Sequence, residues 1–150
     1  METWRREWLP ASDFVQANLS SSAKGVLRGL HYHRRQEDLW LIPSGTAMVA
    51  LVDLRESSST YLAVEAFDLE GAHAVHIPIG VAHGFLALTP VLMSYLVTQV
   101  FDGSDELGVA WDDPDIGVAW PIEAPILSAR DLSNPLWRDV PPERRPDASV

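Results

Sequence analysis

The sequence predicts an all-β domain, built as a sandwich or a barrel. Short apolar segments recur along the chain, separated by turns rich in glycine, proline and serine. Residues 46–54 form an almost continuous apolar run, which indicates a strand buried on both faces. Helical periodicity is weak throughout, so no helical layer is expected.

The expected elements follow in chain order. Residues 1–15 are rich in tryptophan and arginine and predict an edge strand or an arm that docks on a partner subunit. Strands are expected over residues 16–20, 26–33, 39–42, 46–54, 61–67, 75–78, 85–88 and 92–101. From residue 102 the chain is acidic and punctuated by proline, which predicts a C-terminal extension that wraps the barrel, with a helical turn near Ser128. We expect a single domain over 1–140 and a flexible tail over 141–150.

Composition excludes several classes of function. The 150 residues carry a formal net charge of −10, which argues against a nucleic-acid-binding protein. There are no cysteines, and therefore no disulfide, no thiolate nucleophile and no zinc–thiolate site. No apolar run reaches the length of a membrane span, and no signal-peptide pattern is found, so we expect a cytoplasmic protein without a membrane partner.

Histidines mark two of the expected strands. Residues two apart share one face of a strand, so His31 and His33 should point together, and Arg28 should point away unless Gly29 marks a bulge. Asp38 follows His33 at a spacing typical of a metal-binding motif, and Pro78-Ile79-Gly80-Val81-Ala82-His83 supplies a second half. This pair of motifs resembles the cupin pattern, with aspartate where glutamate is usual, and it implies a cupin, or jelly-roll, β-barrel.

Two chemistries are compatible with these side chains. His31, His33, Asp38 and His83 could bind a divalent metal such as Fe, Mn, Ni or Zn. In the other interpretation no metal binds and one histidine acts as a general base. Purely structural histidines are the third option, although three of them at one barrel mouth would be costly to bury without a use.

Longer motifs resemble the dTDP-4-dehydrorhamnose 3,5-epimerase family from about residue 16 to residue 139. They are Lys24-Gly25-Val26-Leu27-Arg28-Gly29-Leu30-His31-Tyr32, Val52-Asp53-Leu54-Arg55, the segment 77–85, the segment 111–117, Trp120-Pro121 and Leu127-Ser128-x-x-Asp131. The resemblance implies an isomerase that needs no metal or other cofactor, forms a homodimer and epimerises a nucleotide-linked 4-keto-6-deoxy sugar.

The resemblance also implies roles for residues. His31 matches the base, and Asp131 matches the carboxylate that orients it. Arg28 is expected to bind the substrate diphosphate. The other residues expected to bind substrate are Gln16, Asn18, His33, Asp38, His83, Glu106 and Trp111.

Two positions depart from the family pattern. Asp38 stands where the family has the lysine that stabilises the enolate oxygen, and Phe101 stands where we place the tyrosine that acts as acid. None of the three tyrosines, Tyr32, Tyr61 and Tyr95, falls at that acid position. Epimerisation at one centre, a metal-dependent cupin reaction and a non-catalytic, ligand-binding cupin therefore remain as alternatives.

Overall fold

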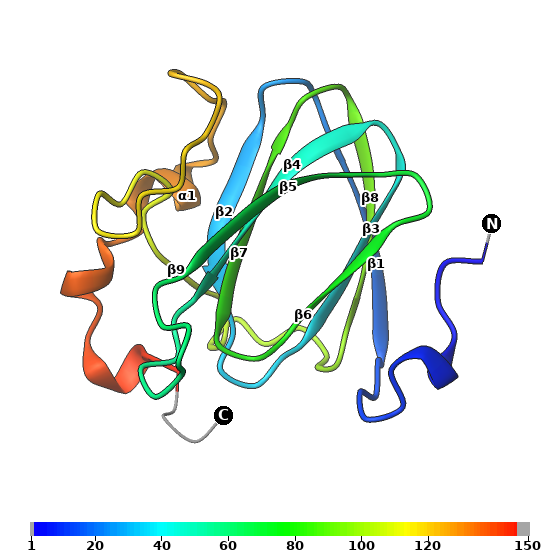
Figure 1. The fold of residues 1–150 in the computed structure, drawn as a ribbon, viewed down its shortest axis with the longest axis horizontal. Helices are drawn as coiled ribbons and strands as arrows, with labels where there is room; N and C mark the ends of the chain where they lie inside the picture. The colour runs from blue at the N-terminus through cyan, green and yellow to red at the C-terminus, as the bar shows by residue number, and fades with distance from the viewer. Residues whose placement is uncertain (1, 147–150) are drawn as a thin grey trace.

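Two antiparallel sheets face each other in the computed structural model, which describes residues 2–146, and they confirm the expected jelly-roll barrel (Figure 1). One sheet has the order β1-β8-β3-β6 and the other has the order β5-β4-β7-β2-β9. The strands are β1 Gln16–Ser22, β2 Leu27–Tyr32, β3 Asp38–Ser44, β4 Thr46–Asp53, β5 Val64–Glu70, β6 Ala74–Ile77, β7 Val81–Ala87, β8 Val91–Val97 and β9 Leu107–Gly108. None of the described helices is long and apolar enough to cross a membrane.

The central strands of the five-stranded sheet, β4 and β7, are covered on both faces. Ala47 and Val49 of β4 point into the barrel, where they pack in a core with Trp40, Phe85 and other residues of both sheets. Their neighbours on the same strand, such as Val52, face outward and pack in a second core. Strict alternation between two apolar environments explains why this segment has almost no polar residues.

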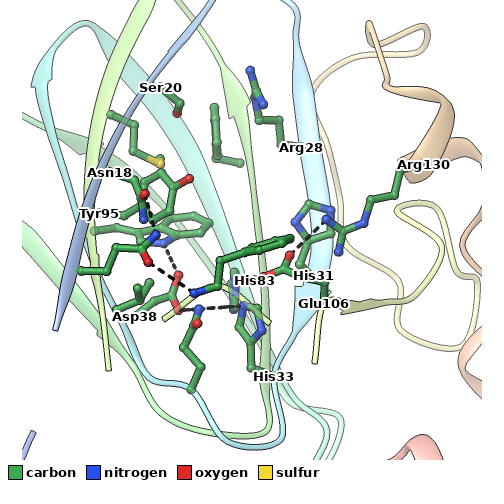
Figure 2. A pocket seen from close by; sticks show the side chains of 17 residues that line it. Asn18, Ser20, Arg28, His31, His33, Asp38, His83, Tyr95, Glu106 and Arg130 are labelled. Carbon is green, nitrogen blue, oxygen red and sulfur yellow. Dashed lines mark hydrogen bonds and ion pairs between the residues drawn. The ribbon is translucent and has the colours of Figure 1, made fainter. Parts of the chain in front are cut away.

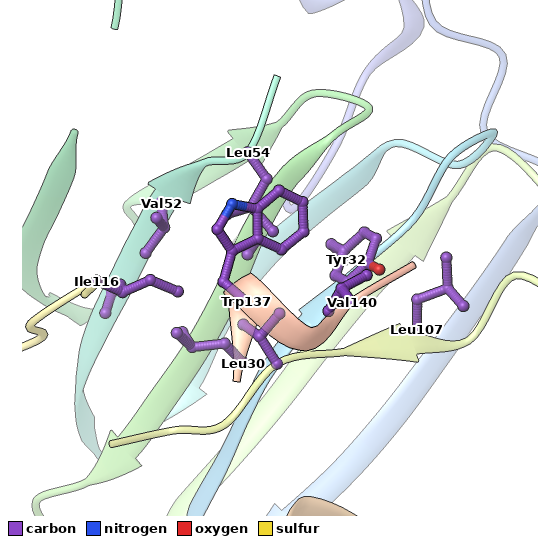
Figure 3. Close-up of a cluster of buried hydrophobic side chains, with 11 residues drawn as sticks. Leu30, Tyr32, Val52, Leu54, Leu107, Ile116, Trp137 and Val140 are labelled. Carbon is purple, nitrogen blue, oxygen red and sulfur yellow. The ribbon is translucent and has the colours of Figure 1, made fainter. Parts of the chain in front are cut away.

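The second core is formed with the C-terminal extension (Figure 3). Residues that follow β8 fold back over the outer face of the sheet through α1 Ala129–Ser133 and the short 3₁₀ turns η2 Trp137–Asp139 and η3 Pro142–Arg144. Trp137 is the largest side chain of this core, and its ring meets Tyr32 edge to face at a centroid distance of 6.1 Å. The expected extension and its helical turn are both present.

Packing continues beyond residue 140, where we had placed the start of a flexible tail. The Tyr32 hydroxyl donates to the Arg144 carbonyl, at an O–O distance of 2.9 Å. The Arg145 guanidinium lies 4.9 Å from the Trp137 ring centroid and pairs with Glu56. Residues 141–146 therefore belong to the packed extension, and only 147–150 of the expected tail lie outside the described residues.

A β-bulge interrupts β2 at the place that Gly29 suggested. Arg28 pairs with Phe85 and His31 pairs with His83, so β2 has one more residue than β7 between the two pairs. The strands approach closely there, because a Cβ on Gly29 would lie 2.6 Å from the Cα of Gly84. Arg28 and His31 consequently line the same cavity, which a regular strand would not allow.

The N-terminal segment does not form a strand before β1. Residues 6–8 form the 3₁₀ turn η1 Arg6–Trp8, and Trp4 packs edge to face on Phe14. β1 follows as an edge strand, paired with β8 alone. In Figure 1 this segment and the C-terminal extension lie on opposite sides of the barrel.

Candidate active site

A cavity of about 440 Å³ opens inside the barrel between the two sheets (Figure 2). Its size falls in the usual range for small-molecule sites. Side chains from both sheets line it, and the apolar ones are Trp40, Phe85, Met93, Val97 and Phe101. The polar and charged lining residues are Gln16, Asn18, Ser20, Arg28, His31, His33, Gln36, Asp38, His83, Tyr95, Glu106 and Arg130.

His31 forms a short pair with Asp131 of the extension, with 2.6 Å between Nε2 and the carboxylate Oδ1. Ser128 is the N-cap of α1: its Oγ accepts from the Asp131 amide and donates to the second carboxylate oxygen at 2.8 Å. Burial alone would raise the pKa of Asp131, but hydrogen bonds from His31 and Ser128 and the nearby charges lower it. An ionised carboxylate only accepts, so Nε2 of His31 carries the proton and Nδ1 is its basic nitrogen.

His33, Asp38 and His83 form a second, fully buried group. One potential ligand atom from each lies within 4.8 Å of the others. The His33 Nδ1 atom donates to the Asp105 carbonyl at 2.8 Å, and the His83 Nδ1 atom donates to the Val81 carbonyl at 3.0 Å. Because Nδ1 of each ring donates, Nε2 is the atom with a lone pair, and Nε2 of His33 accepts from the Gln36 amide at 3.2 Å.

Two neutral donors hold the Asp38 carboxylate. The Gln36 amide donates to Oδ1 at 2.8 Å, and the Trp40 indole donates to Oδ2 at 3.0 Å. Burial, with a smaller opposing effect from Asp38, lowers the pKa of His83 to about 4. His83 is therefore a neutral imidazole at neutral pH.

Tyr95 of β8 lies on the wall opposite His31, because β8 belongs to the four-stranded sheet and β2 to the five-stranded one (Figure 2). Burial raises the pKa of its hydroxyl, and the negative charges of Asp38 and Glu106 raise it further. The phenol therefore keeps its proton at neutral pH and can act as an acid. The other two tyrosines are used in packing: Tyr32 donates to Arg144, and the Tyr61 hydroxyl accepts from Trp137.

Arg28 and Arg130 are the two cationic side chains among the described residues that line the cavity. Arg28 donates to Ser22 Oγ at 3.1 Å and to the Ser21 carbonyl at 3.2 Å. Arg130 pairs with Glu106 at 3.1 Å. Guanidinium groups suit an anionic ligand such as a diphosphate, although Glu106 offsets the charge of Arg130.

The structure brings together most of the residues expected from the sequence. Nine of the ten line the cavity or, in the case of Asp131, bind a lining residue; Trp111 does not line it. Instead, the Trp111 carbonyl accepts from Trp120 within the extension. Of the four residues in the alternative metal-binding interpretation, three have ligand atoms within 4.8 Å of one another, namely His33, Asp38 and His83, whereas His31 is bound to Asp131.

The sequence analysis did not identify four of the polar lining residues: Ser20, Gln36, Tyr95 and Arg130. Met93, Tyr95 and Val97 alternate on β8 and all face the cavity, so strand periodicity offered a signal for Tyr95. Gln36 lies in the turn before β3. Arg130 approaches only because the extension folds back, and periodicity offers no signal for either residue.

Comparison with known proteins gives a consistent picture. The family described as dTDP-4-dehydrorhamnose 3,5-epimerase matches residues 1–139. A protein named dTDP-4-dehydrorhamnose 3,5-epimerase from Methanothermobacter thermautotrophicus is 43% identical over 136 residues, covering 85% of this chain and 71% of that protein. One of the same name from Neisseria gonorrhoeae is 37% identical over 147 residues, covering 91% of this chain, and this chain spans 45% of its length.

A solved structure extends the likeness to three dimensions. It is the epimerase from Legionella pneumophila in complex with dTDP-4-keto-L-rhamnose. The two chains superpose with a TM-score of 0.88 at 31% sequence identity, over 97% of this chain and 83% of the other.

Proposed function

The chain belongs to the dTDP-4-dehydrorhamnose 3,5-epimerase family, and we propose that it epimerises a nucleotide-linked 4-keto-6-deoxy sugar. The observation that carries the proposal is the His31–Asp131 pair at a cavity with a protonated phenol on the opposite wall. A base and an acid on opposite sides of a bound sugar can invert a carbon centre. The 4-ketone makes the hydrogens at C3 and C5 acidic enough to be removed.

His31 is the proposed base. Nδ1 of His31 takes the proton from C3 or C5, the C–H bonding electrons move to the C4 oxygen, and an enolate forms. Asp131 accepts the hydrogen bond from Nε2 and stabilises the imidazolium that results. Ser128 fixes the Asp131 carboxylate, and Asp131 in turn holds the His31 ring in one orientation for this step.

Tyr95 is the proposed acid. It returns a proton to the same carbon from the opposite wall, and solvent then reprotonates the phenolate. The substrate gains and loses one proton, so only the configuration of the carbon changes. This assignment offers an acid to a chain that has Phe101 where the sequence comparison placed a tyrosine.

Arg28 and Arg130 are the proposed ligands of the diphosphate, because they are the cations of the cavity. Gln16 and Asn18, which hydrogen-bond to each other at 2.9 Å on β1, offer polar contacts to the nucleotide sugar. His31 is the one proposed base and Tyr95 the one proposed acid, so we expect the enzyme to invert a single carbon centre of the sugar.

We also propose a cytoplasmic homodimer. β1 is an edge strand with a free row of backbone groups, and Leu19 on it is 69% exposed. A second copy that covered this strand would satisfy both features. Sedimentation equilibrium checks the dimer, and a chain that stays monomeric at micromolar concentration would contradict it.

Deuterium exchange tests the chemistry directly. The enzyme is incubated with dTDP-4-keto-6-deoxyglucose in deuterated water, and NMR then locates deuterium and reports the configuration at C3 and C5. We expect deuterium at one inverted centre in the wild type. His31→Asn should lower exchange by about 10²- to 10⁴-fold. Tyr95→Phe should keep exchange, because His31 can still remove and return a proton, but should lose inversion.

His73→Ala serves as the matched control, because His73 is exposed and lies outside the cavity. It should exchange like the wild type. A wild type that incorporates no deuterium would contradict the proposed reaction on this substrate. Full exchange in His31→Asn would exclude His31 as the base, and full inversion in Tyr95→Phe would exclude Tyr95 as the acid.

A further inference from the structure

Three side chains that the proposed proton transfers do not use are buried together in the cavity wall. His33, Asp38 and His83 are 5%, 4% and 3% exposed. They come from three places in the chain, namely the turn after β2, the start of β3 and strand β7. His33 Nε2 lies 3.9 Å from Asp38 Oδ1, and the two imidazole rings are 5.5 Å apart between centroids.

Both imidazoles are prepared to act as ligands. Each donates Nδ1–H to a backbone carbonyl, that of Asp105 for His33 and that of Val81 for His83, which turns the lone pair of Nε2 toward the group. Metal-binding histidines are usually fixed in this way by a carbonyl or carboxylate behind the ring. Asp105 is itself anchored, because its carboxylate accepts from the amides of Arg34 and Arg35.

Gln36 now occupies the space between two of the three groups. Its amide donates to Asp38 Oδ1 at 2.8 Å and to His33 Nε2 at 3.2 Å. The Gln36 amide therefore occupies the position between His33 Nε2 and Asp38 Oδ1 that a bound cation would occupy. Rotation of this amide by half a turn would present its oxygen, which is also a metal ligand.

We propose that His33, Asp38 and His83 bind one divalent transition-metal ion, such as Zn²⁺, Fe²⁺ or Mn²⁺. Two imidazoles and one carboxylate on one side of an ion suit these metals and leave positions open for substrate or water. This site goes beyond the metal-free chemistry that the family resemblance implies. Asp131 holds His31 outside the site, so a base and a metal can coexist in one cavity.

The role of the ion rests on the proposed epimerase function. Removal of a proton next to the ketone places negative charge on the C4 oxygen, and an unscreened Asp38 carboxylate in the cavity wall would repel it. The two cationic lining residues, Arg28 and Arg130, lie toward the other end of the cavity in Figure 2. A divalent ion bound by two neutral rings and one carboxylate keeps a net positive charge and can polarise the ketone.

Binding is tested without substrate. The full chain is dialysed against a chelator and titrated with Co²⁺, whose visible absorption reports a protein site, and Zn²⁺ is then added as competitor. We expect one Co²⁺ per chain, displaced by Zn²⁺. His33→Gln and Asp38→Asn should each weaken binding by more than about 100-fold.

Matched controls keep this experiment decisive. His73→Ala and Asp68→Asn change exposed residues of the same types and should bind Co²⁺ like the wild type. Thermal unfolding of each variant checks that it folds. Absence of binding by the wild type, or equal binding by folded His33→Gln and His73→Ala, would overturn the site.

The catalytic role has its own measurement. Deuterium exchange by the chelated enzyme should fall by about 100-fold and recover when Zn²⁺ or Mn²⁺ is added, whereas His33→Gln should not respond to metal. Tight Co²⁺ binding with metal-independent exchange would overturn the role and support the site alone. Tight binding with no exchange under any condition would instead contradict the proposed epimerase function.

Discussion

His31 and His33 lie two residues apart, and different partners hold their rings. The buried carboxylate of Asp131 accepts from His31 at 2.6 Å, which fixes the ring and leaves Nδ1 as the nitrogen without a proton. A backbone carbonyl accepts from His33 at 2.8 Å, which fixes the orientation of that ring with Nε2 toward Asp38. These different partners are the reason why we propose proton transfer for His31 and metal coordination for His33.

Asp131→Asn tests the pair at His31. An amide can donate to Nε2, which would move the histidine proton to Nδ1 and remove the basic nitrogen from the substrate side. We expect deuterium exchange to fall by about 10²- to 10⁴-fold with little change in fold, because the Ser128 hydroxyl still caps α1. Asp112→Asn, an exposed change on the same extension, should leave the rate as it is. Equal rates in the two variants would contradict the role of Asp131.

The accuracy of the site prediction depends on where each residue lies in the chain. His31, His33 and His83 were predicted together because strand alternation and two motifs point them to one mouth. Arg28 was uncertain until the bulge at Gly29 was seen. Asp131 entered only through the family resemblance, since it is 100 residues from His31 and no local pattern links them.

At the scale of elements, the connection between β4 and β5 is longer than expected. The sequence predicted a return strand from residue 61, whereas β5 begins at Val64. Asp53 explains the delay. Its carboxylate accepts from the Arg55 amide and guanidinium and from the Thr60 hydroxyl, which holds the intervening chain in turns. The alternation of apolar and polar residues along the sequence cannot reveal this network, because the network consists of side-chain hydrogen bonds.

Asp53→Asn should lower the free energy of unfolding by about 1–3 kcal/mol, measured by urea denaturation at pH 7. Burial would raise the pKa of Asp53, but hydrogen bonds from Arg55, Ser58 and Thr60 outweigh it and hold the pKa well below its ordinary value. A depressed folded-state pKa stabilises the protein above the unfolded pKa of about 3.9, and that contribution is lost as pH falls below it.

The difference between wild type and Asp53→Asn should therefore stay constant from pH 7 to pH 5 and shrink below about pH 4. Asp68→Asn, which alters an exposed carboxylate on β5, provides the baseline at each pH. A difference that remained unchanged at pH 3.5 would show that the charge of Asp53 is not what stabilises the connection.

The whole molecule is a barrel with a cavity inside and an extension packed outside. The barrel follows from short alternating segments, and the doubly buried strand at 46–54 already indicated that something covers the outer face. The sheet order and the path of the extension depend on long-range pairings, which one sequence does not encode locally. That path has a functional consequence, because α1 delivers Asp131 and Arg130 to the cavity.

Trp137→Ala tests this link between packing and chemistry. Trp137 is 4% exposed, its backbone amide donates to Asp113, and its indole donates to the Tyr61 hydroxyl at 2.8 Å. Loss of the ring should cost about 3–5 kcal/mol of unfolding free energy in urea. Because α1 belongs to the same extension, looser docking should also separate Asp131 from His31 and slow deuterium exchange in protein that is still folded.

Leu132→Ala removes an exposed side chain from α1 itself and should change stability by less than about 0.5 kcal/mol. A folded Trp137→Ala protein with full exchange would show that the extension positions Asp131 without this anchor.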